Sequence, residues 1–206
     1  MIKYPNGKIY DPETKQIQTS KAQKTRTKSK EEVSLSAANR GMDLERDINL
    51  SCDFYREKDL ALIYKRPTPI NVVKVDYSKG AKIINAYYEE QSTTDYNGVY
   101  KGRYLDFEAK MTKSKTSFPL NNITKHQITH LKKVILQNGI AFFIIAFSTY
   151  DKIYLLDASF VIDFYEHGER KSIPYEVIKQ EGIEIKRGYY PRLYFLEAID
   201  TQYFSK

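Results

Sequence analysis

The segment Arg103–Met111 reads RYLDFEAKM and alternates polar with apolar side chains along most of its length. Side chains on a β-strand point to opposite faces with a period of two, so this alternation predicts a strand with two unlike faces. The apolar face would carry Leu105, Phe107, Ala109 and Met111, and the other face Tyr104, Asp106, Glu108 and Lys110. Such a strand needs a hydrophobic layer on one side and gathers its charges on the other.

The segments on either side of this strand supply the remaining elements of an α/β fold. Apolar residues spaced by four, four and three predict an amphipathic helix over 42–55, after the helix breaker Gly41. Further strands are expected over 60–65, 70–77, 81–89, 140–147 and 152–157, and a second helix over 124–137. Turns are expected at 78–80, which closes a long hairpin, and at Asn97-Gly98. The core order is αβββαβ, without an internal repeat.

The N-terminal segment differs in composition from the rest of the chain. Residues 1–30 hold eight basic side chains against two acidic ones, whereas the other 176 residues are nearly neutral. Residues 11–38 are also poor in apolar side chains and cannot form a core. We therefore expect a flexible basic arm over 1–38 and one folded domain over 39–206. Such an arm is typical of proteins that bind polyanions, although it could also be a solvated tail without a partner.

A membrane location is not expected. The longest apolar run, Ile140–Phe147, has eight residues, whereas a membrane-spanning helix needs about 20. The N-terminus has no apolar stretch of the kind found in a signal peptide. The single cysteine, Cys52, permits no intrachain disulfide and fits the reducing cytoplasm. Nucleic acid is therefore the expected polyanionic partner.

Asp95 and Glu108 are candidate metal ligands. Cutting a phosphodiester calls for a divalent cation that activates water, and Mg²⁺ prefers a few hard oxygen ligands. Asp95 comes just before Asn97-Gly98 and Glu108 follows thirteen residues later, so a tight fold-back would bring both carboxylates to one ion. Lys110, on the same strand face, would orient the water or stabilise the pentacoordinate phosphate. The competing interpretation is that Asp106, Glu108 and Lys110 are the solvent-exposed face of an edge strand.

The spacing of these residues resembles a nuclease signature. An acid followed by D/E-x-K on an αβββαβ core is similar to the PD-(D/E)xK nucleases, and among them the chain resembles the RecU-type Holliday junction resolvases. The likeness runs from about Asn39 to the C-terminus, and the arm matches only at Tyr4-Pro5-Asn6-Gly7. It rests on Asn39–Met42 with Glu45, Lys65–Pro69, Ser92–Gly98, Gly102–Lys110 and Thr116–Leu120. One departure is Thr94, which precedes the first acid where the superfamily has proline.

This resemblance implies a restriction-endonuclease-like αβββαβ core with a protruding β-hairpin stalk over residues 66–89 that enters the centre of a four-way DNA junction. It also implies a homodimer that resolves Holliday junctions by paired Mg²⁺-dependent nicks in recombination and repair, which suits the approximate two-fold symmetry of a junction. By the same likeness Thr93, Asp95, Glu108 and Gln127 bind Mg²⁺, and Lys110 stabilises the transition state. Docking of a strand-exchange recombinase on the body is left open.

Other residues extend the candidate site. Glu45, at the margin of the first helix's apolar face, could lean over the metal, although glutamates in such places are usually solvated. Asp106 is a second candidate supporting residue. His126 and His130 have the H-x₃-H spacing of a zinc site but no evident third ligand, so we expect them on a DNA-facing or solvent-exposed helix face. Without the resemblance, Gln127 would be an ordinary helix-edge amide.

Expected DNA contacts involve basic and aromatic side chains on and around the hairpin. The candidate DNA-binding residues are Lys65, Arg66, Lys74, Lys79, Lys82 and Arg103. Tyr77, Tyr87 and Tyr88 could stack on unpaired bases, although most of the eighteen tyrosines suit ordinary strand positions. Two rival functions stay open on sequence alone. One is an endonuclease of the same fold that cuts plain duplex, and the other is a non-catalytic nucleic-acid-binding protein.

Overall fold

The computed structural model describes residues 2–3, 9–10, 30–89 and 93–205, with side chains from Leu44 onward. The chain divides into two compact units, Met1–Ser36 and Ala37–Lys206. In the first unit β1 (Ile2–Lys3) and β2 (Ile9–Tyr10) pair antiparallel. Most of the flexible basic arm expected over residues 1–38 therefore lies outside the described residues.

Helix α1 (Lys30–Glu57) begins well before the helix expected over 42–55. Its first residues, KEEVSLSAA, are rich in Lys, Glu, Leu and Ala, which all have high helix propensity. Gly41 lies inside the helix instead of breaking it, since one interior glycine costs only about 1 kcal/mol. The expected start is therefore wrong, whereas the expected buried face is confirmed. Its residues Leu44, Ile48, Cys52 and Tyr55 are at most 3% exposed.

A six-stranded sheet forms the centre of the second unit, in the order β12-β10-β9-β7-β6-β3. Its strands are β3 (Leu62–Lys65), β6 (Tyr96–Tyr100), β7 (Arg103–Thr112), β9 (Ile140–Phe147), β10 (Lys152–Asp157) and β12 (Ile183–Glu184). β7 runs parallel to β9, and the other neighbouring pairs are antiparallel. With further elements inserted between some of them, α1, β3, β6, β7, α2 (Lys125–Leu136) and β9 follow in this order along the chain, which confirms the predicted αβββαβ core. Strand β6 is not among the strands expected from the sequence.

Strand β7 lies inside the sheet, and its two faces differ as its sequence predicts. Leu105 and Phe107 are fully buried in the hydrophobic cluster on one face. Asp106 and Glu108, on the other face, are 0% and 1% exposed. Because β6 and β9 pair with the two edges of β7, its interpretation as a solvent-exposed edge strand is wrong. Burying two carboxylates is costly, so their surroundings must compensate for it.

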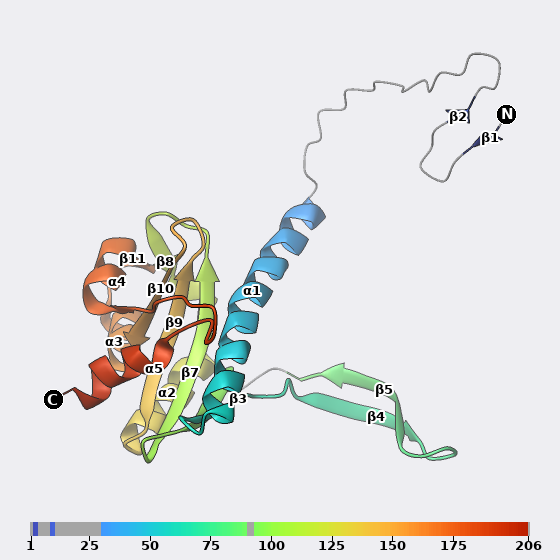
Figure 1. The fold of residues 1–206 in the computed structure, drawn as a ribbon, viewed down its shortest axis with the longest axis horizontal. Coiled ribbons are helices and arrows are strands. Elements are labelled where there is room, and N and C mark those ends of the chain that lie inside the picture. Colours follow the sequence, from blue (N-terminus) through green and yellow to red (C-terminus); the bar gives the residue numbers. More distant parts are fainter. Residues whose placement is uncertain (1, 4–8, 11–29, 90–92, 206) are drawn as a thin grey trace. The chain divides into compact units, whose positions relative to one another are not determined.

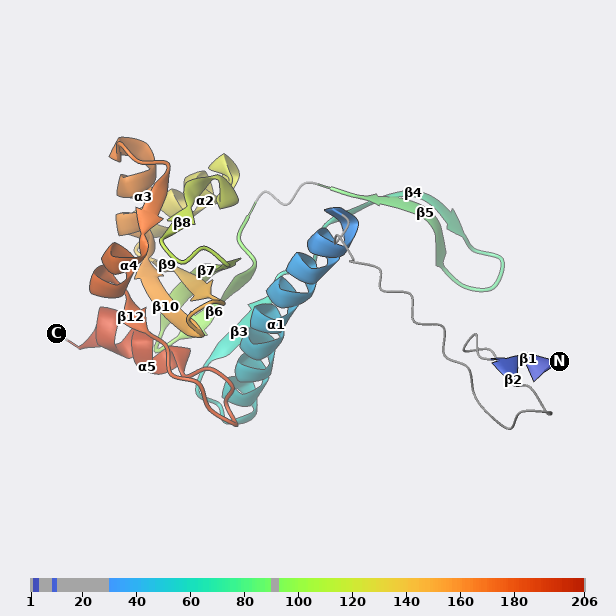
Figure 2. The same ribbon diagram turned by 90° about the horizontal axis from the view of Figure 1, so that it is seen from above.

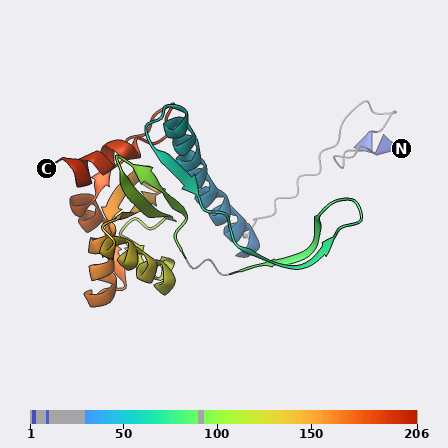
Figure 3. The ribbon, with the colours of Figure 1, turned by 90° about the horizontal axis from the view of Figure 1, so that it is seen from below.

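Helices cover both faces of the sheet (Figures 2 and 3). α1 and α5 (Phe195–Ile199) pack on the face of Leu105 and Phe107, and α2 and α3 (Ala158–His167) pack on the other. Phe107 stacks between Tyr96 and Phe142, with ring centroids 4.8 and 4.6 Å away. The layer of α1 and α5 thus packs against the apolar face of β7, while α2 covers the face that carries Asp106 and Glu108.

Strands β4 (Ile70–Asp76) and β5 (Lys82–Tyr88) form the predicted hairpin and pair only with each other within the described chain (Figure 1). Their register sets Ile70 opposite Tyr88 and Asp76 opposite Lys82. The connecting turn passes through Gly80 at a φ of 100°, which favours glycine. Every residue of β5 is exposed, so the hairpin adds little to the core.

Shorter elements complete the second unit. They are β8 (Ser117–Pro119), the 3-10 turn η1 (Leu120–Asn122), β11 (Ser172–Pro174), α4 (Tyr175–Glu181) and the final turn η2 (Asp200–Phe204). β8 and β11 pair with each other, antiparallel. In the described part of the chain, no helix has the length and apolar character needed to cross a membrane.

Candidate active site

The β6–β7 hairpin brings Asp95 beside Glu108. Tyr96, the first residue of β6, is opposite Phe107 of β7, so the preceding Asp95 lies level with Glu108. The backbone N–H of Asp95 donates a hydrogen bond to Glu108 Oε2 at 3.1 Å. Two acids that are thirteen residues apart in the sequence therefore meet through a tight antiparallel connection.

The turn of this hairpin lies at Lys101-Gly102, and the turn expected at Asn97-Gly98 is wrong. Lys101 and Gly102 have φ angles of 47° and 75°, whereas Asn97 and Gly98 lie within β6. Gly98 serves another purpose, because a Cβ atom there would come within 2.2 Å of the Leu62 carbonyl oxygen on β3. Asn-Gly is a common turn sequence, but here its glycine allows two strands to approach closely.

Glu108 is buried and in contact with both a cation and an amide. Lys110 Nζ lies 2.7 Å from Glu108 Oε1, and Gln127 Nε2 donates to the same oxygen at 2.6 Å. Burial raises the pKa of the Glu108 carboxyl from 4.5 to about 7. The Lys110 ammonium opposes this shift, and the neighbouring Asp95 carboxylate adds to it. The ionised form of Glu108 is thus held in an unfavourable environment.

Gln127 links Glu108 to the beginning of α2. The helix starts with a capping box, in which the Thr124 hydroxyl accepts from the Gln127 N–H at 3.3 Å and Gln127 Oε1 accepts from the Thr124 N–H at 3.0 Å. The amide nitrogen of Gln127 is then left to donate to Glu108. Gln127 is 8% exposed and points toward the sheet, as its position in the helix predicts. Thr93 is half-buried, and its hydroxyl makes no hydrogen bond to the other candidates among the described residues.

Asp106 is the centre of a second buried cluster on the same strand face. Arg66 Nη2 and the Tyr104 hydroxyl donate to its Oδ2 at 2.7 and 2.8 Å, His130 Nε2 lies 2.9 Å from that oxygen, and the Thr94 hydroxyl donates to Oδ1. Burial acts to raise the pKa of Asp106, but the bonds from His130 and Thr94, with the charge of Arg66, outweigh it and lower the pKa. Asp106 is therefore an ionised group that links β7 to α2, to the residue after β3 and to the segment before β6.

This cluster corrects what the sequence suggests for His130. Its expected place on a solvent-exposed helix surface is wrong, because its side chain is 23% exposed and bonded to Asp106, whereas His126 is exposed as expected. The signal available in the sequence is spacing, since His130 comes three residues after the inward-pointing Gln127 and shares its helix face. Thr94 and Tyr104 are also part of the cluster, and sequence reasoning missed both.

Of the two candidate DNA-binding residues before the hairpin, Arg66 contacts the buried Asp106 cluster and Lys65 pairs with Glu45. Arg66 Nη1 donates to the Thr94 hydroxyl at 2.9 Å, and its backbone N–H donates to the Asp95 carbonyl oxygen at 2.7 Å. Lys65 forms an ion pair with Glu45, each side chain being 39% exposed. Glu45 is thereby directed to Lys65, and it makes no hydrogen bond to Asp95 or Glu108 within the described chain.

The remaining candidate DNA-binding cations lie apart from the carboxylates. Lys74, Lys79 and Lys82 are exposed on the β4–β5 hairpin. Arg103 is exposed at the start of β7, where its Nη2 donates to the Asn138 carbonyl oxygen at 2.5 Å. These side chains present positive charge to solvent and form no ion pair with a described acid, although Asp76 is opposite Lys82 in the hairpin register.

The donor set fits a magnesium ion better than a zinc ion. Among the described residues no group of three or more His, Cys, Asp and Glu side chains could hold a metal. Asp95 and Glu108 nevertheless place two carboxylates side by side, and their repulsion contributes to the raised pKa of Glu108. A divalent cation would relieve that repulsion. Mg²⁺ suits such a site because it binds through one or two carboxylates and keeps several waters.

Comparison with known proteins identifies the family. Residues 39–201 match the model of the family described as RecU, Recombination protein U. Proteins called Holliday junction resolvase RecU from Bacillus cereus (strain G9842) and Bacillus anthracis (strain CDC 684 / NRRL 3495) are each 47% identical, over 99% of this chain and 99% of theirs. The Holliday junction resolvase Hjc of Archaeoglobus fulgidus aligns over 69% of this chain and 94% of its own, at 14% identity and a TM-score of 0.43. The extent of the family match and the identity to the Bacillus proteins show that this chain belongs to the RecU family.

Proposed function

We propose that this protein is a Mg²⁺-dependent endodeoxyribonuclease that resolves Holliday junctions, acting as a homodimer in DNA recombination and repair. The observation that carries the proposal is the contact of Asp95 and Lys110 with Glu108, a carboxylate that is 1% exposed. The names of the Bacillus relatives, at 47% identity, support junction DNA as the substrate. We place the reaction in the cytoplasm, which suits a chain whose single cysteine, Cys52, is buried and free.

The energetic cost of this cluster supports catalysis over a purely architectural role. A protein that only binds DNA would gain stability from an apolar residue at position 108, because an ionised carboxylate is costly to bury. Glu108 instead keeps a raised pKa beside a second carboxylate. Strongly perturbed acids next to a charged partner are typical of functional sites. The non-catalytic alternative leaves this arrangement unexplained.

In the proposed mechanism Asp95 and Glu108 bind the cation, with Thr93 and Gln127 completing its surroundings. Mg²⁺ bound there would activate water and neutralise charge on the scissile phosphate. Gln127 Nε2 keeps the Glu108 carboxylate oriented while Gln127 Oε1 stays fixed by the capping box. Direct ligation through that oxygen would require the amide to leave the capping box.

Lys110 supplies the positive charge for the transition state. Its ammonium lies 2.7 Å from Glu108, and its side chain is 22% exposed, so it borders both the carboxylates and solvent. From there it can donate hydrogen bonds to a phosphate oxygen or to the attacking water. Fixed donors that meet developing negative charge are a major source of rate enhancement in phosphoryl and acyl transfer.

The hairpin and the dimer account for selectivity toward branched DNA. Tyr77, Tyr87 and Tyr88 are 75%, 57% and 79% exposed on the hairpin, where aromatic rings can stack on unpaired bases. The exposed lysines of β4 and β5 and of their turn add contacts to phosphates. An isologous dimer would present one cutting centre to each of two opposite strands of a junction.

The experiment compares cleavage of a synthetic four-way junction and of linear duplex DNA at equal salt, with and without Mg²⁺. The parent protein should nick the junction in pairs only when Mg²⁺ is present, and EDTA should stop the reaction. Glu108→Gln and Asp95→Asn should bind the junction and leave it intact, whereas Glu176→Gln, an exposed acid on α4, should cleave like the parent. Equal cutting of duplex would instead favour the duplex-cutting endonuclease, and cleavage by Asp95→Asn would refute the site.

A further inference from the structure

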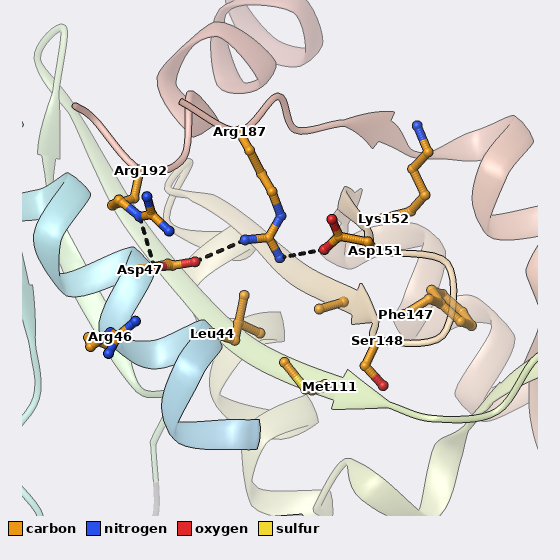
Figure 4. Close-up of a pocket in the computed structure, with 11 residues that line it drawn as sticks. Leu44, Arg46, Asp47, Met111, Phe147, Ser148, Asp151, Lys152, Arg187 and Arg192 are labelled. Atoms are coloured by element: carbon orange, nitrogen blue, oxygen red, sulfur yellow. Dashed lines mark hydrogen bonds and ion pairs between the residues drawn. The ribbon is translucent and has the colours of Figure 1, made fainter. Parts of the chain in front are cut away.

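A cavity of about 310 Å³ lies on the opposite face of the sheet from the candidate active site (Figure 4). Met111 of β7 and Ala146 of β9 line it. Ala146 belongs to the hydrophobic cluster that includes the buried face of α1, and Met111 packs against that cluster. Lys110 and Met111 are consecutive on β7 and point to opposite faces. The cavity and the Glu108 cluster therefore lie on opposite faces of the sheet, near the C-terminal end of β7.

The cavity is rimmed by more basic than acidic side chains. The basic ones are Arg46, Lys152, Arg187 and Arg192, and the acidic ones are Asp47 and Asp151. Asp47 of α1 is 5% exposed and is bonded to two of the arginines. Arg187 Nη1 donates to its Oδ2 at 2.9 Å, and Arg192 Nε donates to its Oδ1 at 3.2 Å. Two guanidinium groups are thus already ordered around one buried carboxylate, so a ligand would not have to immobilise them.

Not all of these donors are occupied. Arg187 uses both Nη groups, on Asp47 and at 3.1 Å on Asp151, and Lys152 pairs with Glu184 at 2.5 Å. Arg192 makes only its Nε bond within the described chain, which leaves its two Nη groups for a ligand. Arg46 is exposed and has no hydrogen bond or ion pair to any described residue. Figure 4 shows Arg46 and Arg192 on either side of Asp47.

We propose that this cavity binds a phosphate group through Arg46 and Arg192. Guanidinium groups offer paired N–H donors that match the oxygens of a phosphate, and they stay charged at any physiological pH. Given the function proposed above, we assign the phosphate to the backbone of a DNA arm that continues past the cutting centre. A free phosphate group is the other source of the same chemistry.

A structural role alone explains part of this cluster. Leu193 N–H donates to the Ser51 hydroxyl at 2.8 Å, and the Tyr55 hydroxyl donates to the Leu193 carbonyl oxygen at 2.7 Å. Together with the bonds of Asp47, these contacts fasten the segment around Leu193 to α1. None of these contacts involves Arg46 or the Nη groups of Arg192. A substitution of Arg46 therefore tests for a phosphate site without disturbing the hydrogen bonds that hold the segment around Leu193 to α1.

The first measurement titrates inorganic phosphate into the protein, replacing chloride at constant ionic strength and pH 7, and follows the Arg192 Nε–Hε signal by NMR. The catalytically disabled Glu108→Gln chain is used alongside the parent, so the result does not depend on cleavage. A saturable shift is expected in both, unchanged in the control Lys58→Gln and lost in Arg46→Gln. Absence of a saturable shift in the parent overturns the proposal.

The second measurement identifies the source of the phosphate. Affinity for a four-way junction is measured over a range of salt concentrations. Arg46→Gln should lower the slope of log Kd against log salt by about one, and Lys58→Gln should lower it less. An unchanged slope with Arg46→Gln, together with phosphate binding, would overturn the DNA assignment and leave a site for free phosphate. A parent that binds phosphate but never cleaves junctions would instead overturn the proposed function.

The variants are chosen so that folding does not confuse the result. Arg46 is exposed on a helix, and glutamine is a good helix former, so Arg46→Gln should keep the parent's melting temperature. Arg192→Lys provides a second test, because a lysine keeps a positive partner for Asp47 but loses the paired donors. Weaker phosphate binding by Arg192→Lys, at an unchanged melting temperature, is the expected result, and undiminished binding would contradict the role of Arg192.

Discussion

Arg66 connects the strand that precedes the β4–β5 hairpin to two acidic residues of the candidate active site, Asp106 and Asp95. Its Nη2 donates to Asp106 Oδ2 at 2.7 Å, while its backbone N–H donates to the carbonyl oxygen of Asp95 at 2.7 Å. Because Arg66 follows the last residue of β3 and precedes β4, it lies where the hairpin leaves the sheet. One residue thus fixes the base of the hairpin and the backbone of a proposed metal ligand together.

Removing the Asp106 carboxylate should destabilise the fold. Asp106→Ala would leave Arg66 without its buried ionic partner and remove the acceptor of the Thr94 and Tyr104 hydroxyls, and the loss of one partner from a buried ion pair costs about 3–5 kcal/mol. Urea denaturation would measure the free energy of unfolding. Asp163→Ala, which removes an exposed acid paired with His167, is the control and should change little. If both variants had the same stability, Asp106 would not be a structural anchor.

Arg66→Lys should weaken the metal site without removing a charge. A lysine has one donor nitrogen in place of the two Nη groups, of which one contacts Thr94 and the other Tyr104 and Asp106, so the Asp95 backbone would be less firmly held. We expect the Mg²⁺ concentration for half-maximal cleavage to rise by about tenfold, the lower end of the effect of losing a residue that orients a metal ligand. Arg103→Lys, at an exposed arginine that bonds a backbone carbonyl, is the matched control. An unchanged Mg²⁺ requirement would argue against this linkage.

The contrast between β7 and its surroundings shows what could be predicted from sequence. The alternation over 103–111 predicts which side chains share a face, because it depends only on local strand geometry. It cannot separate an edge strand from a central one, since that depends on the parallel pairing with β9 after the intervening helix α2. The carboxylate of Asp106 likewise meets His130 and Arg66 from distant segments. The spacing from Gln127 places His130 on the inward face of its helix, but no spacing in the sequence pairs it or Arg66 with Asp106.

Two local signals were overridden by context. Gly41 does not end α1, because the good helix formers on both sides of it outweigh one glycine. The Asn97-Gly98 pair has the composition of a turn, but the close approach of the Leu62 carbonyl oxygen explains why a glycine occurs there inside a strand. In both cases the neighbours of the glycine decide its role, and its own conformational preference does not.

The raised pKa of Glu108 predicts how stability depends on pH in the absence of metal. A carboxyl whose pKa is higher in the folded state stabilises the fold below its unfolded pKa near 4.5, and this contribution is lost as pH rises through the folded pKa of about 7. At pH 8 Glu108→Gln should therefore exceed the parent in stability by on the order of 3 kcal/mol. Thermal or urea unfolding of both proteins from pH 4 to pH 8, in EDTA, measures the difference.

Addition of Mg²⁺ to the same samples provides the control. The ion should stabilise the parent, because it binds the folded state, and should stabilise Glu108→Gln less, since an amide is a weaker ligand. Glu176→Gln, at an exposed acid, should follow the parent under every condition. A parent and a Glu108→Gln protein whose stabilities run parallel from pH 4 to pH 8 would contradict the assigned burial of the Glu108 charge.

Lys110→Gln should separate chemistry from binding. The Lys110 ammonium is the cation in contact with Glu108, at 2.7 Å, and its charge opposes the rise in the pKa of that carboxyl. Its removal should leave Glu108 protonated to a higher pH and withdraw the charge that meets the phosphate, so we expect the single-turnover rate to fall by about 100-fold or more. Junction affinity should stay within a few-fold of the parent, because the exposed lysines of the hairpin are untouched.

Lys133→Gln, at an exposed residue of α2, controls for the loss of one positive charge. A variant that binds and cleaves as Lys133→Gln does would show that Lys110 only neutralises Glu108 and takes no part in the reaction.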